Sequence, residues 1–244
     1  MRDVVLLHGW GMTSAVWCAL RARWPASWRV HALDLAPHIE AAVPGDALSL
    51  VAHSIAARAP ARCSVLGWSL GAEVALQWAL QRPEQVHRLA LIGATPCFVA
   101  RADWTSAMRP AVFEAFAALV GTDPAAALAR FTLLQAQGDE HMSRVARALR
   151  AAVHDTAAHG EAALSKGLDI LRRADLRPCL PRVAPPVRIL HGERDGLVPV
   201  SAAEYLEHAL PHASLHIMRE AAHAPHLSQP ERTAALIMEF FDER

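Results

Sequence analysis

The stretch SVLGWSLGAEVALQWAL, residues 64–80, joins a short apolar run to a longer helical pattern through the pentapeptide GWSLG. A serine with a glycine two positions before it and another two positions after it is typical of a sharp turn between a strand and a helix, which exposes the serine oxygen. The glycines let the backbone turn tightly and let the two elements approach closely. An ordinary surface turn is the alternative, but the flanking strand and helix patterns favour a nucleophile at Ser69.

Short apolar runs alternate with longer helical patterns along most of the chain, as in a parallel sheet covered by helices on both faces. We expect strands over residues 4–8, 28–34, 63–67, 88–93, 187–192 and 214–218. Helices are expected over about 14–24, 46–59, 71–82, 201–210 and 230–242. The sequence therefore predicts an α/β fold with a mostly parallel central sheet.

The alternation breaks between Phe98 and Arg182, where helical patterns follow one another without a convincing strand. These patterns cover about residues 110–120, 123–137, 139–152 and 161–173. A helical insertion of this size between two strands is best placed as a lid over the carboxyl edge of the sheet. We therefore expect a core domain of residues 1–97 and 183–244, with residues 98–182 inserted as a helical lid.

A serine nucleophile needs a base that takes its proton and an acid that orients the base. For a serine on this kind of turn the chain order is serine, acid, histidine. HGERDGLVP (191–199) follows one strand and offers Asp195, with Glu193 as the alternative acid. EAAHAPH (220–226) follows the last strand and offers His223, with His226 as the alternative base. We predict Ser69, Asp195 and His223 as the catalytic residues.

Acyl transfer also needs backbone N–H groups that stabilise the oxyanion, and losing one such donor typically costs about a hundred- to a thousand-fold in rate. Leu70 follows the nucleophile and supplies the first donor by position. The second is expected from the loop after the first strand, LLHGWGM (6–12), where Trp10 follows a tight turn at His8 and Gly9. A plain glycine turn is the alternative reading of that loop. We predict an oxyanion hole formed by Trp10 and Leu70.

The composition excludes several other classes of function. Lysine plus arginine equals aspartate plus glutamate at 24 each, so a global basic field for nucleic acid is absent. The four cysteines are scattered without metal spacing, and no motif for a metal or a phosphate-bearing cofactor appears. No apolar run approaches the roughly 18 residues that span a bilayer, and no secretory signal is evident. We expect a cytoplasmic monomer without cofactor, metal or membrane contact.

The motifs together resemble the α/β-hydrolase superfamily, and within it the pimeloyl-[acyl-carrier-protein] methyl ester esterases of biotin synthesis. The resemblance covers most of the chain, including the expected lid. It rests on the segments VVLLHGWGM, VLGWSLG, RPEQVHRLALIGATPCF, RFTLLQAQG, GLDILRRADLR, DGLVP and AAHAPHLSQP. The tryptophans beside the catalytic motifs, TPCF and RFTLLQ are more specific than the superfamily motifs.

This resemblance implies hydrolysis of the methyl ester that masks the distal carboxyl of a pimeloyl chain, whose other end stays in thioester linkage to acyl carrier protein. Methanol is released, and no cofactor takes part. By carry-over onto matching positions, the substrate site consists of Trp10, Trp68, Ser69, Leu70, Phe131, Thr132, Leu133, Leu134, Gln135 and His223. Phe131 and Leu134 are three apart on a helix and share a face, which could equally serve packing between lid and core.

The resemblance also implies a surface for the acidic carrier protein. Arg130 and Arg147 match arginines of the family, and Arg144 lies in a stripe with Arg147 and Arg150 along one helix. A solvated charged face is the alternative reading of that stripe. Other family arginines have no counterpart, since Ala126 and Ser143 occupy their positions.

Two segments depart from the family pattern. The chain begins directly at the first strand, where relatives usually carry one or two earlier strands, so we expect a sheet that lacks an edge. After ALDL, the segment APHIEAAVPGDALSL (36–50) replaces a common glycine-rich loop.

The motifs leave other functions open. A broad short-chain esterase, haloperoxidase or lyase chemistry on the same triad, and a hydrolase-like binding protein are the alternatives. Serine rather than aspartate at position 69 disfavours haloalkane dehalogenation.

Overall fold

The central sheet of the molecule is parallel throughout. A computed structural model describes residues 2–43, 45–153 and 160–243, and these residues form a six-stranded sheet in the order β2-β1-β3-β4-β5-β6. Every neighbouring pair in it is parallel. The strands are β1 (Arg2–Leu7), β2 (Trp28–Leu33), β3 (Cys63–Trp68), β4 (Val86–Ile92), β5 (Val187–Gly192) and β6 (Ala213–Met218). The predicted α/β fold with a mostly parallel sheet is confirmed.

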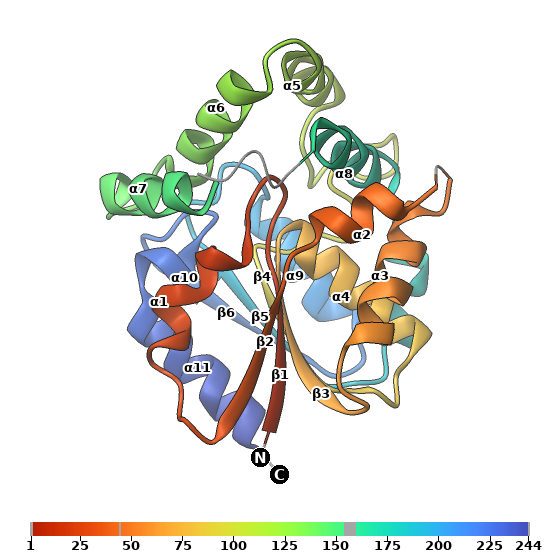
Figure 1. Cartoon of the computed structure of the whole chain (residues 1–244), viewed down its shortest axis with the longest axis vertical. Coiled ribbons are helices and arrows are strands. Elements are labelled where there is room, and N and C mark those ends of the chain that lie inside the picture. Colours follow the sequence, from red (N-terminus) through yellow and green to blue (C-terminus); the bar gives the residue numbers. More distant parts are fainter. Residues whose placement is uncertain (1, 44, 154–159, 244) are drawn as a thin grey trace.

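Helices cover both faces of this sheet, which explains its continuous apolar strands. On one face lie the 3-10 turn η1 (Ser14–Trp17), α1 (Cys18–Arg21) and α11 (Pro230–Asp242) (Figure 1). On the other face lie α3 (Ala47–Arg58), α4 (Leu70–Gln81) and α9 (Val200–Ala209). The inner strands β3 and β5 are buried along their whole length, whereas the edge strands β2 and β6 are largely half-buried.

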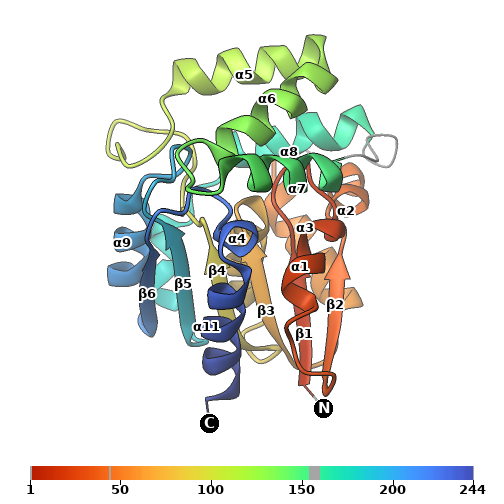
Figure 2. The same cartoon turned by 90° about the vertical axis from the view of Figure 1, so that its left-hand side faces the viewer.

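Four helices lie above the carboxyl edge of the sheet, between β4 and β5 in the chain (Figures 1 and 2). We call them the cap helices: α5 (Pro110–Thr122), α6 (Pro124–Ala136), α7 (Met142–Val153) and α8 (Glu161–Arg173). Proline at the first position suits the starts of α5 and α6, and the Asp123 side chain accepts the Ala126 N–H at 2.9 Å. The 3-10 segment η3 (Arg177–Arg182) leads back to β5.

The structure adds short elements that periodicity did not predict. Helix α2 (Ala36–Ala41) lies inside the segment that departs from the family pattern, and α10 (Pro225–Ser228) follows the predicted catalytic histidine. The helix expected over residues 14–24 consists of η1 followed by a single turn of α1. Elements this short contain too few residues to show a helical period.

The GWSLG motif packs helix α4 closely against the sheet. A Cβ on Gly71 would lie 2.2 Å from the carbonyl oxygen of Leu7 and 2.6 Å from that of His8. A Cβ on Gly67 would lie 2.4 Å from the carbonyl oxygen of Gly71. Both glycines are therefore required because the first turn of α4 rests directly on backbone atoms.

Replacing Gly71 tests this contact. We expect Gly71→Ala to lower the free energy of unfolding by about 3 kcal/mol, since a backbone carbonyl cannot move aside as a side chain end does. The matched control is Gly121→Ala in α5, where nothing lies within 4 Å of the new Cβ. That variant should gain about 0.5–1 kcal/mol from helix propensity. Urea unfolding measures both; equal stabilities would contradict the packing argument.

Candidate active site

Ser69 occupies a strained backbone position between β3 and α4. Its φ of 54° and ψ of −121° place it in a region that favours glycine, a conformation that typically costs about 1–3 kcal/mol. The turn is held by hydrogen bonds from Ser69 N to Ile92 O (3.0 Å) and from Ala72 N to Ser69 O (2.8 Å). Ser69 is half-buried, while its neighbours Trp68 and Leu70 are buried. The turn thus presents the serine at the carboxyl edge of the sheet.

Asp195 and His223 form a buried pair at the same edge. The Nδ1–H of His223 donates to Asp195 Oδ2 at 2.7 Å, because an ionised carboxylate can only accept. Asp195 Oδ1 accepts the backbone N–H groups of Leu197 (2.9 Å) and Val198 (3.0 Å). Nε2 of His223 has no hydrogen-bond partner among the described residues. The histidine is therefore oriented at one nitrogen and available at the other.

The surroundings of Asp195 keep it charged. Burial acts to raise its pKa, but the charge and hydrogen bond of His223, the charge of His191 and the Val198 N–H together hold the pKa below its ordinary value. His191 is itself buried, with Nε2 donating to the carbonyl oxygen of Val198 at 2.9 Å. Asp195 can therefore stabilise a proton on His223 at neutral pH.

Several contacts bring His223 next to the turn at Ser69. The indole N–H of Trp68 donates to the carbonyl oxygen of His223 at 2.9 Å. The Ser69 N–H donates to the carbonyl of Ile92, and the next residue is Gly93. A Cβ on Gly93 would lie 3.0 Å from Cε1 of His223. Gly93 also has a φ of 53°, a second reason for glycine there. The imidazole is thus packed against the end of β4, beside the turn at Ser69.

The alternative acid and base lie elsewhere. Glu193 Oε2 accepts the backbone N–H of Glu220 at 3.0 Å on the surface. His226 is fully buried between the rings of Trp17 and Trp68, at centroid distances of 4.8 Å and 4.7 Å. Neither ring nitrogen of His226 has a hydrogen-bond partner among the described residues. The geometry therefore pairs Asp195 with His223 and gives His226 a packing position.

Trp10 and Leu70 lie together above the turn. Leu70 is the first residue of α4, so its N–H has no carbonyl partner within the helix. The Trp10 indole donates to the carbonyl oxygen of Leu164 in α8 at 2.9 Å. A Cβ on Gly167 would touch both side chains, Trp10 Cδ1 at 2.8 Å and Leu70 Cδ2 at 3.7 Å. The arrangement places both predicted oxyanion donors at the same end of the sheet.

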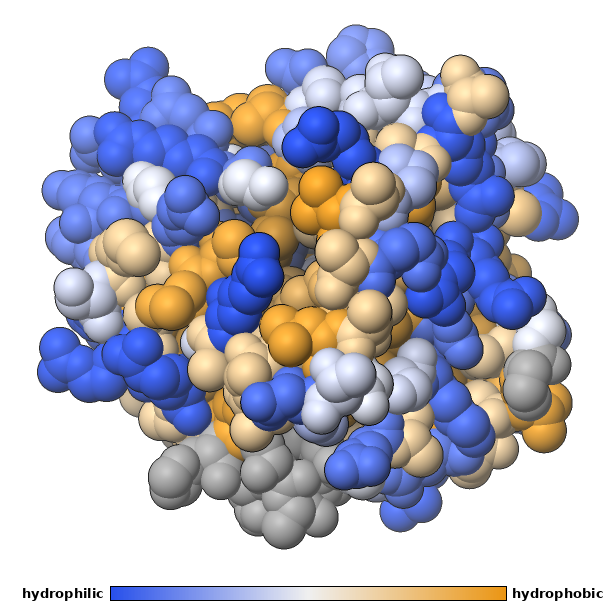
Figure 3. Space-filling view, turned by 90° about the horizontal axis from the view of Figure 1, so that it is seen from above, coloured by the Kyte–Doolittle hydropathy of each residue, from blue (hydrophilic) through white to orange (hydrophobic). Residues whose placement is uncertain are grey.

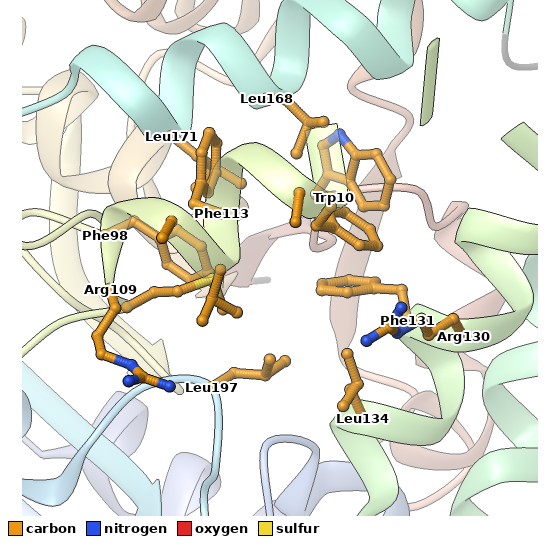
Figure 4. A pocket seen from close by; sticks show the side chains of 15 residues that line it. Trp10, Phe98, Arg109, Phe113, Arg130, Phe131, Leu134, Leu168, Leu171 and Leu197 are labelled. Atoms are coloured by element: carbon orange, nitrogen blue, oxygen red, sulfur yellow. The ribbon is translucent and has the colours of Figure 1, made fainter. Parts of the chain in front are cut away.

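An apolar cavity of about 370 Å³ opens between the cap helices and the core. Apolar side chains gather in the middle of the cap face, among hydrophilic ones (Figure 3). Trp10 meets Phe131 edge-on at 5.0 Å and Phe116 at 5.5 Å. The lining is apolar apart from two arginines and consists of Trp10, Phe98, Met108, Arg109, Ala111, Val112, Phe113, Ala115, Phe116, Arg130, Phe131, Leu134, Leu168, Leu171 and Leu197 (Figure 4).

Only part of the predicted substrate site lines this cavity. Trp10, Phe131 and Leu134 do, whereas Leu133 is exposed and the Thr132 hydroxyl donates back to Ala129 O at 2.8 Å. The carbonyl of Gln135 accepts the His223 N–H at 3.2 Å, and Trp68 is buried behind the turn. The sequence analysis did not predict the part of the cavity wall that α5 and α8 form. Pairs of apolar residues three apart on these helices could have indicated it: Phe113 with Phe116, and Leu168 with Leu171.

The arginines predicted for carrier docking differ in their surroundings. Arg130 is exposed and lines the cavity (Figure 4). Arg147 is exposed on α7. The guanidinium of Arg144 donates to the carbonyl oxygen of Ser228, so part of it serves a contact between cap and core.

Within residues 2–43, 45–153 and 160–243, no group of three or more histidine, cysteine, aspartate or glutamate side chains could hold a metal ion. In the same residues, no helix is long and apolar enough to cross a membrane.

The chain is similar to known proteins over most of its length. The profile of the Alpha/beta hydrolase family matches residues 4–236. The chain belongs to the alpha/beta hydrolase family. It is 41% identical over 240 residues to a pimeloyl-[acyl-carrier protein] methyl ester esterase of Aromatoleum aromaticum, covering 96% of each chain. It is 40% identical over 231 residues to the enzyme of that name from Nitrosomonas europaea, covering 94% of this chain and 92% of the relative.

A solved structure shows the same fold at lower identity. The esterase from Exiguobacterium antarcticum superposes with a TM-score of 0.86 at 22% identity, covering 100% of this chain and 92% of its own. The resemblance inferred from the motifs is therefore confirmed at the level of family and fold.

His226 makes the stability of this hydrolase depend on pH. Burial, with a smaller contribution from the charge of His223, lowers the pKa of His226 from 6.5 to about 3. Below about pH 6.5 the unfolded chain therefore takes up a proton that the folded chain does not, so the folded state loses stability as the pH falls.

We expect His226→Phe to weaken this dependence. Between pH 8 and pH 5 the wild type should lose about 2 kcal/mol more unfolding free energy than the variant, at about 1.4 kcal/mol for each pH unit below 6.5. Urea unfolding at the two pH values gives the difference, and His53→Phe, at an exposed position on α3, is the control. An unchanged pH dependence in His226→Phe would rule out this role.

Proposed function

We propose that the chain is a serine carboxylesterase that hydrolyses the methyl ester of a pimeloyl chain attached to acyl carrier protein, releasing methanol, in biotin biosynthesis. The observation that carries the chemistry is the buried His223–Asp195 pair beside the strained turn at Ser69, below an apolar cavity. The substrate follows from the relatives, which are about 40% identical over nearly the whole chain.

The reaction takes place in two steps. Ser69 Oγ attacks the ester carbonyl while Nε2 of His223 takes the hydroxyl proton, and Asp195 stabilises the resulting imidazolium. The N–H groups of Leu70 and Trp10 stabilise the oxyanion. Collapse of the tetrahedral intermediate breaks the bond to the methoxy group, which leaves as methanol with the proton from His223. Water then attacks the acyl-enzyme, His223 takes its proton, and the free carboxylate and Ser69 are regenerated.

The cavity suits an acyl chain. Its wall is built from aromatic and leucine side chains of α5, α6 and α8, and such a wall binds methylene groups without leaving polar groups unpaired. The charged groups of its lining, Arg109 and Arg130, are exposed side chains (Figure 4). A substrate with an apolar middle and a polar or anionic far end fits this distribution.

We also propose that the carrier protein docks on the cap helices through Arg130 and Arg147, with Arg144 contributing less because its guanidinium already binds Ser228. An acidic partner would be attracted by these cations and released by salt. The free cysteines fit a location in the cytoplasm, where thiols stay reduced.

Removal of the Ser69 hydroxyl tests the chemistry. We expect Ser69→Ala to lower kcat on p-nitrophenyl butyrate by at least about a thousandfold, because no other group would replace the nucleophile. The matched control is Ser64→Ala, at a buried serine of β3 whose hydroxyl has no hydrogen-bond partner in the described part of the chain. Equal rates for Ser69→Ala and the wild type would contradict the assignment of Ser69 as the nucleophile.

Charge reversal on α7 tests the carrier surface. Arg147→Glu should raise KM for carrier-bound methyl ester about tenfold at low salt, with the rate on p-nitrophenyl butyrate unchanged. Arg62→Glu makes the same charge change before β3, at the opposite edge of the sheet. It should leave both the KM for the carrier-bound ester and the rate on p-nitrophenyl butyrate unchanged. An equal KM in Arg147→Glu and Arg62→Glu would remove α7 from the docking surface.

Growth of a biotin-requiring strain that lacks its methyl esterase tests the pathway. The wild-type chain should restore growth, and Ser69→Ala should not. Failure of an active esterase to restore growth would leave a broad short-chain esterase as the function.

A further inference from the structure

A buried carboxylate joins the cap helices to the loop that carries His223. Asp139 lies in the corner between α6 and α7, residues 137–141, and is only 6% exposed. Its Oδ2 accepts the backbone N–H of Ala222 at 2.8 Å. Its Oδ1 accepts the Ser228 hydroxyl at 2.7 Å and the backbone N–H of His141 at 2.8 Å. Asp139 is therefore fully engaged, and two of its three partners lie on the far side of the junction between cap and core.

Asp139 binds the residue that immediately precedes the histidine. The N–H of Ala222 donates to Asp139, and the carbonyl oxygen of Ala222 rests against Gly192, where a Cβ would lie only 1.9 Å away. This backbone therefore has contacts on both sides, with the cap above and the end of β5 below. A shift of Asp139 would move Ala222 and, with it, the imidazole of His223.

Further bonds of the cap reach the same loop, residues 219–224. The carbonyl of Gln135 accepts the His223 N–H at 3.2 Å, and the N–H of Glu140 donates to the carbonyl oxygen of Glu220 at 2.9 Å. Glu220 has a φ of 63°, a strained conformation for a residue with a side chain. The loop is thus held in a costly conformation partly by bonds from the cap.

We propose that Asp139 is a positioning residue, which holds the Ala222 peptide and thereby sets the imidazole of His223 for proton transfer. The inference rests on the proposed role of His223 as the base. It makes the cap helices part of the catalytic apparatus as well as a wall of the acyl cavity. Misplacement of a catalytic group by about 1 Å can cost on the order of a hundredfold in rate.

The variant Asp139→Asn separates positioning from burial. Asn keeps the shape but has a single acceptor oxygen, and that oxygen should stay with the two donors at the Oδ1 position. Its NH₂ group then faces the Ala222 N–H, donor against donor. We expect kcat on p-nitrophenyl butyrate to fall ten- to a hundredfold, with KM within about twofold, because the cavity wall is untouched.

Two controls distinguish this effect from a general loss of stability. Ser228→Ala removes one Oδ1 donor and keeps the Ala222 bond. Gln85→Ala removes a buried side chain that bonds Trp78, Ala56 and Pro60, away from the carboxyl edge. All three variants should lower the melting temperature. Ser228→Ala and Gln85→Ala should nevertheless keep kcat within about twofold of the wild type at 25 °C.

Each outcome decides the proposal. A folded Asp139→Asn with wild-type kcat would overturn it, as would equal losses of kcat in Asp139→Asn and Gln85→Ala. If Ser69→Ala were as active as the wild type, the proposed function would fail first. If Ser69→Ala is inactive and Asp139→Asn keeps full kcat, only the positioning role fails.

Discussion

The backbone contact between the first turn of α4 and the end of β1 fixes the rest of the site. No side chain fits at Gly71, where a Cβ would lie 2.2 Å from the Leu7 carbonyl oxygen. The helix therefore starts directly on the sheet, and the chain must turn at Ser69 with a φ of 54°. The same contact brings Leu70 beside the loop of Trp10. Strain at Ser69 is thus offset by the packing of the buried residues on either side of it, Trp68 and Leu70.

Parallel strands supply the remaining groups. Because all carboxyl ends meet at one edge, the loops after β5 and β6 bring Asp195 and His223 to the serine turn. The cap helices lie over the same edge, where Trp10 packs against Phe131 of α6 and its indole bonds to α8. The cavity and the candidate active site are therefore linked, because Leu197 lines the cavity and its backbone N–H binds Asp195. A change in the cap can alter catalysis as well as binding.

Sequence reasoning predicted the strands and the long helices because each has a local signal. The buried strands appear as apolar runs, and GWSLG is recognisable as a pentapeptide, although Gly71 is required by its contact with Leu7 and His8 at the end of a distant strand. Contacts between distant segments have no such signal. Asp139 reads as the start of a helix, yet its partner Ser228 lies 89 residues away. Arg144 reads as one of a charged stripe, but its guanidinium reaches Ser228, 84 residues away.

The central claim is that Ser69 is the nucleophile and that His223 activates it. Reaction with diethyl p-nitrophenyl phosphate, followed by mass spectrometry of the intact chain and of its peptides, measures both parts. We predict one diethylphosphoryl group per chain, attached to Ser69, and a labelling rate at least about a hundredfold lower in His223→Ala. A label on another residue, or the same labelling rate without His223, would contradict the claim.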